Sequence, residues 1–170
     1  MFRSGIKARS VVTTLEQSHL KGNVTLGIDK ETYLMKEGEH VQNDANWFFH
    51  NNIGYIFPYK QSVCMSNKEE TGTWFHINRS SSSSKETVRE KVFKLWINHG
   101  ASLNNGTYEY VIMPAATQEE VMAYTADPRI KTVSNTPEIQ AVWHSSLNMA
   151  YVAFYQAGTI KIRDVMELSS

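Results

Sequence analysis

Short apolar runs rich in aromatic and β-branched residues alternate along this chain with breaks made of Asn and Gly. The clearest is WFFHNNIGYIF at 47–57, and GTWFHIN at 72–78 repeats its character. Apolar runs of only a few residues between turn formers are typical of paired strands rather than helices. The first half therefore predicts strands near 11–17, 32–35, 46–50, 53–58, 62–65 and 73–77.

The second half continues the strand pattern and adds one helix. Bulky residues at successive positions around Trp96 predict a strand that is covered on both faces. Thr117 and Glu120 have the spacing of a capping box, and Asp127-Pro128 ends the segment, so a short helix is expected near 117–125. Further strands are expected near 108–113, 130–134, 139–144, 149–155 and 159–165. The predicted class is all-β, with two packed antiparallel sheets and one short helix.

A chain of 170 residues is long enough to bury one sizeable core. We expect a disordered or truncated leader over 1–10, one sandwich domain over 11–166 and a tail over 167–170. Five serines at 80–84 bury too little apolar surface to offset the entropy of ordering, so they predict a mobile loop inside that domain.

Charge and cysteine content narrow the possible partners. Lys plus Arg equal Asp plus Glu at 17 each, so no overall field favours nucleic acid or an acidic membrane, and neither is expected as a partner. Cys64 is the only cysteine, which excludes an internal disulfide and a thiolate zinc site. No apolar run reaches the roughly 20 residues of a membrane span, and the first residues lack the zones of a signal peptide.

The candidate binding residues gather around the first aromatic run. His40, Asn43 and Asn46 lie in the densest polar segment before a strand, and such loops often carry function. Trp47 offers a flat apolar ring, and His50 stands beside amides at a turn, so both are candidates to face a sugar. His76 and His99 lack the local spacing of a metal motif, and no metal site is predicted.

Several motifs in fixed order resemble polysaccharide lyase family 8, the chondroitin, hyaluronan and xanthan lyases. The resemblance covers about residues 10 to 160 and falls on the family's central β super-sandwich domain, a fold of the galactose-mutarotase-like kind. Single motifs are weak, whereas six in one order are fairly specific. They are TTLEQ at 13–17, the run 47–57, GTW at 72–74 with IN at 77–78, HG at 99–100, YEY at 108–110 and MP at 113–114, and the stretches NT at 135–136, QAV at 140–142 and VAF at 152–154 continue the resemblance.

The resemblance implies a domain that supports chemistry performed elsewhere. Family members cleave uronic-acid polysaccharides by β-elimination, and they draw the catalytic Asn, His, Tyr and Arg from a helical domain that nothing here resembles. An acidic residue from their sandwich domain lies ahead of the part resembled. We therefore assign no catalytic residue and expect the isolated chain to be inactive, forming one wall of a cleft for an acidic polysaccharide in a larger protein.

The same resemblance implies a bacterial secreted or periplasmic enzyme in which the helical domain is the missing partner. No cofactor is expected, and a structural calcium in the parent enzyme stays open. Two other functions also stay open. An independent carbohydrate-binding module requires an exposed aromatic platform, so an exposed Trp47 would favour it and a buried Trp47 would favour the scaffold. A free-standing mutarotase-like sugar enzyme requires a His and a carboxylate that converge in a concave face.

Overall fold

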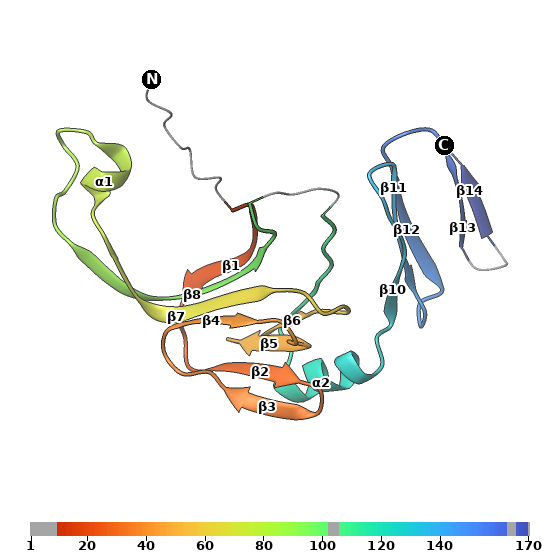
Figure 1. The fold of residues 1–170 in the computed structure, drawn as a ribbon, viewed down its shortest axis with the longest axis horizontal. Helices are drawn as coiled ribbons and strands as arrows, with labels where there is room; N and C mark the ends of the chain where they lie inside the picture. The colour runs from red at the N-terminus through yellow and green to blue at the C-terminus, as the bar shows by residue number, and fades with distance from the viewer. Residues whose placement is uncertain (1–9, 102–105, 163–165, 170) are drawn as a thin grey trace, which may run out of the picture. The chain divides into compact units, whose positions relative to one another are not determined.

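The computed structural model describes residues 10–101, 106–162 and 166–169 of the chain (Figure 1). Antiparallel strands dominate these residues, and two short helices complete them, so the predicted all-β class is confirmed. Contacts divide the chain into two compact units, residues 1–121 and 122–170, where the sequence predicts a single domain over 11–166. The expected leader lies outside the described residues, except for Ser10.

The first unit is a sandwich of two antiparallel sheets. The four-stranded sheet has the order β1-β8-β7-β4, and the five-stranded sheet has the order β3-β2-β5-β6-β9. Beyond the sandwich, β7 and β8 continue as a long two-stranded arm with α1 at its tip (Figure 1). The elements are β1 (Val12–His19), β2 (Val24–Ile28), β3 (Glu31–Leu34), β4 (Glu39–Gln42), β5 (Trp47–His50), β6 (Ile53–Ile56), β7 (Val63–Gly72), α1 (Trp74–Asn78), β8 (Val88–Asn98) and β9 (Val111–Pro114).

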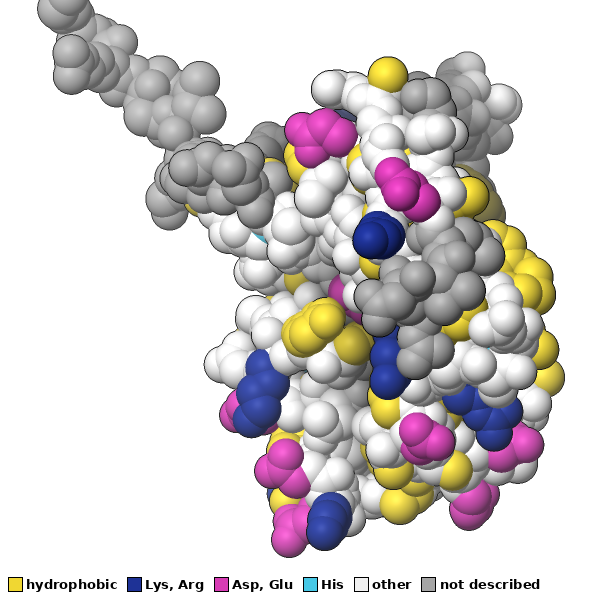
Figure 2. Space-filling view, turned by 90° about the vertical axis from the view of Figure 1, so that its right-hand side faces the viewer, with side chains coloured by type: hydrophobic (Ala, Val, Ile, Leu, Met, Phe, Trp, Pro, Cys, Tyr) yellow, Lys and Arg dark blue, Asp and Glu magenta, His cyan; other side chains and the backbone are white. Residues whose placement is uncertain are grey.

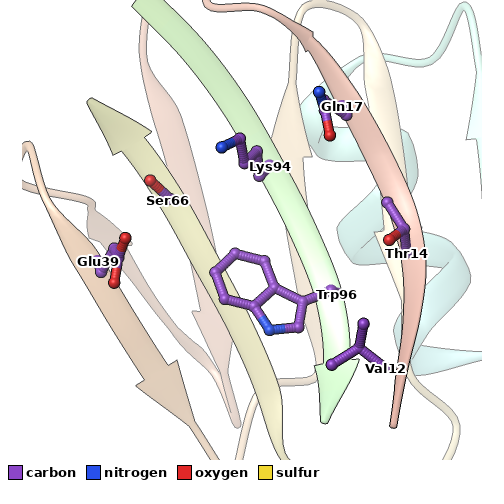
Figure 3. A pocket seen from close by; sticks show the side chains of 7 residues that line it. All are labelled: Val12, Thr14, Gln17, Glu39, Ser66, Lys94 and Trp96. Atoms are coloured by element: carbon purple, nitrogen blue, oxygen red, sulfur yellow. The ribbon is translucent and has the colours of Figure 1, made fainter. Parts of the chain in front are cut away.

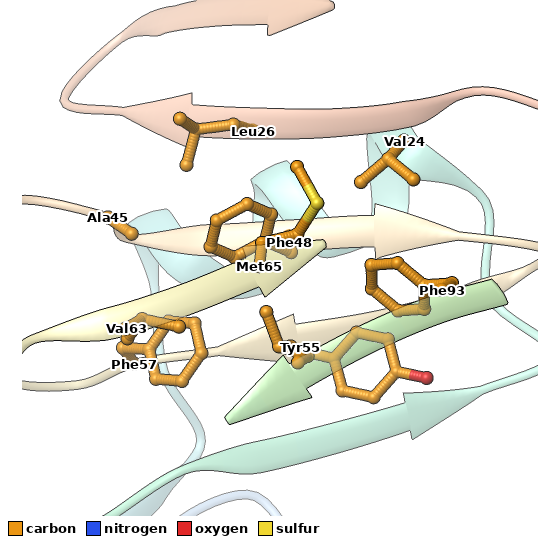
Figure 4. Close-up of a cluster of buried hydrophobic side chains, with 10 residues drawn as sticks. Val24, Leu26, Ala45, Phe48, Tyr55, Phe57, Val63, Met65 and Phe93 are labelled. Atoms are coloured by element: carbon orange, nitrogen blue, oxygen red, sulfur yellow. The ribbon is translucent and has the colours of Figure 1, made fainter. Parts of the chain in front are cut away.

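The core of this unit lies between its two sheets (Figure 4). Alternate residues of β7 and β8 point inward from the four-stranded sheet and meet inward residues of β2, β5 and β6. Each fully buried side chain of this size contributes about 1.5–3 kcal/mol through removal from water. The buried cluster consists of Val24, Leu26, Ala45, Phe48, Tyr55, Phe57, Val63, Met65, Phe93 and Leu95.

The helix predicted near 117–125 is confirmed as α2 (Gln118–Ala126). The N–H of Glu120 donates to Thr117 Oγ1 at 3.2 Å, and the N–H of Thr117 donates to Glu120 Oε2 at 2.8 Å. This reciprocal pair is the predicted capping box. Val121 on this helix is buried and lies so close to Gly54 of β6 that a Cβ there would come within 2.3 Å of it.

The second unit holds a three-stranded antiparallel sheet of order β10-β11-β12 and a separate β-hairpin. Ala141 and Trp143 on β11 and Ile162 on β13 are its buried apolar residues among those described. The final strand occupies 166–169, within the stretch where the sequence predicts a tail. The strands are β10 (Ile130–Asn135), β11 (Ile139–His144), β12 (Met149–Phe154), β13 (Thr159–Ile162) and β14 (Met166–Ser169).

Two predictions about tryptophans are corrected by the structure. The strand predicted at 73–77 is helix α1, because Thr73 Oγ1 accepts the N–H of His76 at 3.0 Å and caps a helical turn. Trp74 on α1 is 62% exposed. The strand around Trp96 is not covered on both faces: in β8, buried Phe93, Leu95 and Ile97 alternate with side chains that are only partly buried.

Gly27 lies inside β2, although glycine is depleted in strand interiors. It pairs with Trp47 of β5, whose indole occupies the space that a Cβ at Gly27 would take. A Cβ at Gly27 would fall 2.0 Å from Trp47 Cε2, far inside any van der Waals contact. The absent side chain therefore creates the space that buries Trp47.

We expect Gly27→Ala to lower the free energy of unfolding by about 1–3 kcal/mol or more, since the methyl group must displace a packed indole. Gly72→Ala is the matched control, because nothing lies within 4 Å of a Cβ at Gly72 of β7. Urea unfolding followed by circular dichroism measures both variants. Equal stability of the two variants would contradict the packing of Trp47 on Gly27.

Candidate functional site

Trp47 and His50, two of the predicted sugar-facing residues, are both buried, on opposite faces of the five-stranded sheet. Trp47 is 3% exposed and His50 is 1% exposed. Both belong to β5, a strand in the interior of the five-stranded sheet. Neither side chain presents a surface to a ligand in this structure.

His50 is held as a neutral, buried imidazole. Its Nε2 accepts the backbone N–H of Lys21 at 3.0 Å, which places the ring proton on Nδ1. Its ring lies 4.4 Å from the ring of Phe93, centroid to centroid. Burial lowers the pKa of His50, Glu16 opposes that shift, and Lys21 adds to it.

The other three candidates lie on loops or edges and have different roles. Asn46 is partly buried and connects strands: its side-chain oxygen accepts the N–H of Asp29, and its backbone carbonyl accepts the N–H of Phe57 at 2.8 Å. His40 on β4 is partly buried, and its Nε2 lies 2.9 Å from the carbonyl oxygen of Lys36. Asn43 is exposed in the loop that follows β4. The structure thus brings no pocket together from the five predicted residues.

A different surface gathers polar and aromatic groups: the outer face of the four-stranded sheet, opposite the core. The strand register aligns its side chains in rows that cross all four strands. One row is polar and runs Glu39, Ser66, Lys94, Gln17. The neighbouring row is mainly apolar and runs Val41, Cys64, Trp96, Thr14.

Residues of these two rows line an open hollow of about 310 Å³ on the face of the sheet (Figure 3). Figure 3 looks onto the face and shows the Trp96 indole broadside, between β7 and β8, with Lys94 one row further along β8. Ser66 Oγ is buried and has no hydrogen-bond partner among the described residues. Residues lining the hollow are Val12, Thr14, Gln17, Glu39, Ser66, Lys94 and Trp96.

The charged groups around the hollow are already paired. Lys94 Nζ lies 2.8 Å from Glu70 Oε1, and Lys68 Nζ lies 2.6 Å from Glu39 Oε1. Basic and acidic side chains are also mixed on the face of the molecule shown in Figure 2. These residues therefore create no strong local field of one sign.

The sequence reasoning missed this face because it placed Trp96 in a doubly covered strand. The signal that identifies the face is alternation in β8, where Phe93, Leu95 and Ile97 share one side and Lys94 and Trp96 share the other. Among the described residues, no three or more His, Cys, Asp or Glu side chains form a group suited to a metal ion. None of the described helices has the length and apolar character needed to cross a membrane.

Comparison with known proteins identifies the family. Residues 3–125 match the polysaccharide lyase family 8 super-sandwich domain, and residues 131–170 match the C-terminal β-sandwich domain of the same family. The chain belongs to polysaccharide lyase family 8. The predicted resemblance is confirmed, but it is not limited to the central domain, since the last 40 residues match the family's second β domain.

Relatives and solved structures agree with this assignment. The chain is 37% identical over 162 residues to chondroitinase-AC of Pedobacter heparinus, covering 92% of this chain and 22% of that enzyme. It is 28% identical over 152 residues to xanthan lyase of a Bacillus species, covering 89% of this chain and 14% of that enzyme. A chondroitinase AC lyase structure, solved with oligosaccharides, superimposes with a TM-score of 0.84 and 35% identity over 96% of this chain and 24% of that one. The chain thus spans less than a quarter of these relatives' length.

The burial of His50 predicts a specific dependence of stability on pH. Its pKa is lower in the folded state than the ordinary value of about 6.5, so the unfolded chain binds the proton more readily. Neutral His50 makes its full contribution to the free energy of unfolding above pH of about 6.5, and this contribution is lost as the pH falls toward the pKa of the folded state. The difference in unfolding free energy between wild type and His50→Gln should therefore shrink on acidification.

Urea unfolding at a series of pH values measures that difference. His76→Gln is the control, since His76 is exposed on α1. A wild-type advantage over His50→Gln that stays constant across the series would contradict a buried neutral imidazole.

Proposed function

We propose that this chain is the β-sandwich part of a lyase that cleaves an acidic, uronate-containing polysaccharide by β-elimination. In this proposal it forms one wall of the substrate cleft, and the base and acid come from a helical domain. Family membership supports the proposal, as do the names of the relatives, which are chondroitin, xanthan and hyaluronate lyases. The share of each relative that the chain spans also fits a supporting part rather than a whole enzyme.

The main observation in support of the scaffold role is that two acid–base side chains, His50 and Tyr55, are buried. Burial lowers the pKa of His50, with the Glu16 carboxylate opposing that shift, and Tyr55 OH donates to Glu16 Oε2 at 2.8 Å. Tyr55 is 1% exposed, and burial together with the Glu16 carboxylate raises its pKa. A phenol with a raised pKa and a histidine with a lowered one, both in the core, are structural groups that no sugar reaches.

The same burial weighs against the two other functions. A mutarotase-like enzyme requires an accessible His and carboxylate, whereas His50 points into the core. A binding module built on Trp47 requires an exposed ring, whereas Trp47 is packed on Gly27. The scaffold therefore remains the function that the geometry supports best.

The proposal extends to partners and location. The helical domain that carries the catalytic groups is the proposed protein partner, and the polysaccharide is bound through the complete enzyme. Bacterial secretion or a periplasmic location fits a substrate that is too large to enter a cell. No resident cofactor is proposed for these residues.

The lyase proposal is tested by ultraviolet absorbance of the unsaturated product. The purified chain should release none from chondroitin, hyaluronan or xanthan, because elimination without a positioned base and acid forfeits orders of magnitude in rate. A chimera of Pedobacter heparinus chondroitinase-AC, with this chain in place of the segment it matches, should form the product from chondroitin.

The chimera is first checked for a cooperative melt, so that misfolding is separated from inactivity. A folded chimera without activity would contradict the scaffold role. Product formed by the chain alone, and lost in His40→Ala, would place an active site within the chain itself.

A further inference from the structure

We propose that the hollow on the outer face of the four-stranded sheet binds an uncharged pyranose unit, such as the N-acetylhexosamine of a glycosaminoglycan, stacked on Trp96. The inference deepens the proposed function and depends on it for the identity of the polymer. The pyranose class itself follows from the residues of the hollow.

Trp96 supplies the apolar half of a sugar site. Its indole is seen broadside on the face of the sheet rather than edge-on (Figure 3). The C–H groups on one side of a pyranose form a flat apolar surface that matches such a ring. Val12, 48% exposed on β1, extends the apolar floor beside the indole.

The row next to Trp96 supplies directional hydrogen bonds. Gln17 carries both a donor and an acceptor, Glu39 carries acceptors, and Lys94 carries donors, all along one line across the sheet. Sugar hydroxyls and an acetamido group both donate and accept, so this mixture suits them.

Ser66 is the second, independent indication of a polar ligand. Its side chain lines the hollow, its residue is 1% exposed, and its hydroxyl has no partner among the described residues. A buried hydroxyl without a hydrogen bond costs about 1–3 kcal/mol. A ligand hydroxyl that reaches Ser66 Oγ would satisfy it.

The paired charges around the hollow favour an uncharged sugar over a uronate as the ligand. Lys94 and Lys68 are each paired with a carboxylate, Glu70 and Glu39, so the hollow holds balanced charge. A carboxylate or sulfate would have to break one of these pairs. An apolar protein layer fits less well, because it would remove the charged Glu39 and Lys94 and the amide of Gln17 from water.

The experiment is an NMR titration of the complete chain with a hyaluronan hexasaccharide, which presents N-acetylglucosamine beside glucuronate. The indole N–H resonance of Trp96 should shift in a saturable manner. Trp96→Ala should weaken binding at least about tenfold. Trp74→Ala is the matched control, since Trp74 is the exposed indole on α1, away from the hollow, and this variant should bind as wild type does.

Gln17→Ala is a second variant for the case that Trp96→Ala fails to fold. Gln17 is exposed on β1, so its replacement should leave the fold intact. This variant should weaken binding several-fold. Binding should change little between low and moderate salt, as expected for an uncharged contact. The assay is independent of the elimination assay, so a failed chimera and a failed titration can be told apart.

Three results would overturn the site. The first is an unshifted Trp96 resonance at millimolar hexasaccharide. The second is a change in binding that does not fit the hollow. Equal loss of binding in Trp74→Ala would locate the contact elsewhere, and an affinity that falls steeply with salt would assign the contact to the uronates. The third is a Trp96 shift that follows protein concentration rather than sugar, which would mark the face as a contact between copies of the chain.

Discussion

Phe93 connects the two sheets of the first unit, and the rest of that unit depends on this contact. The side chain leaves β8 of the four-stranded sheet and packs against His50 and Tyr55 of the five-stranded sheet, with centroid separations of 4.4 and 6.0 Å. Aromatic pairs of this kind add about 0.5–1.5 kcal/mol to the free energy gained by burial. A buried imidazole and phenol would be costly beside it without partners. Lys21 and Glu16 provide those hydrogen bonds.

This contact also decides which side of the four-stranded sheet is free. With Phe93 and Leu95 directed inward, the strand pleat directs Lys94 and Trp96 outward. The inner face then carries the buried core, and the outer face carries the hollow beside Trp96. A sandwich used as one wall of a cleft requires this division, because a rigid interior holds an exposed face in a fixed position. The sequence similarity to enzymes several times longer fits the same role.

Most of the strands and the cap of α2 were predictable, because both depend on local sequence. The capping box at Thr117 formed as expected, whereas the cap at Thr73 was missed since the aromatic residues after it suggested a strand. Strands β2, β4 and β14 were not predicted. Glycine usually favours turns, and the cross-strand indole of Trp47 explains the place of Gly27 inside β2.

The site was less predictable than the fold. Sequence marks Trp47 and His50 as aromatic and polar groups near a turn, and that description holds equally for a buried pair and for a sugar platform. The burial of His50 depends on the sheet that packs over it, through a contact with Phe93 more than 40 residues later, whereas the burial of Trp47 depends on the space left by Gly27. The rows on the outer face likewise arise from the pairing of β1, β4, β7 and β8.

Hydroxyl-radical footprinting of the intact chain, read residue by residue by mass spectrometry, tests the scaffold account most directly. The account predicts rapid oxidation of Trp74, slower oxidation of the partly buried Trp96, and strong protection of Trp47 and Phe93 until the chain is unfolded in denaturant. Oxidation of Trp47 and Phe93 in the folded chain at a rate close to that of Trp74 would contradict it, because the residues assigned to the core would then be open to solvent.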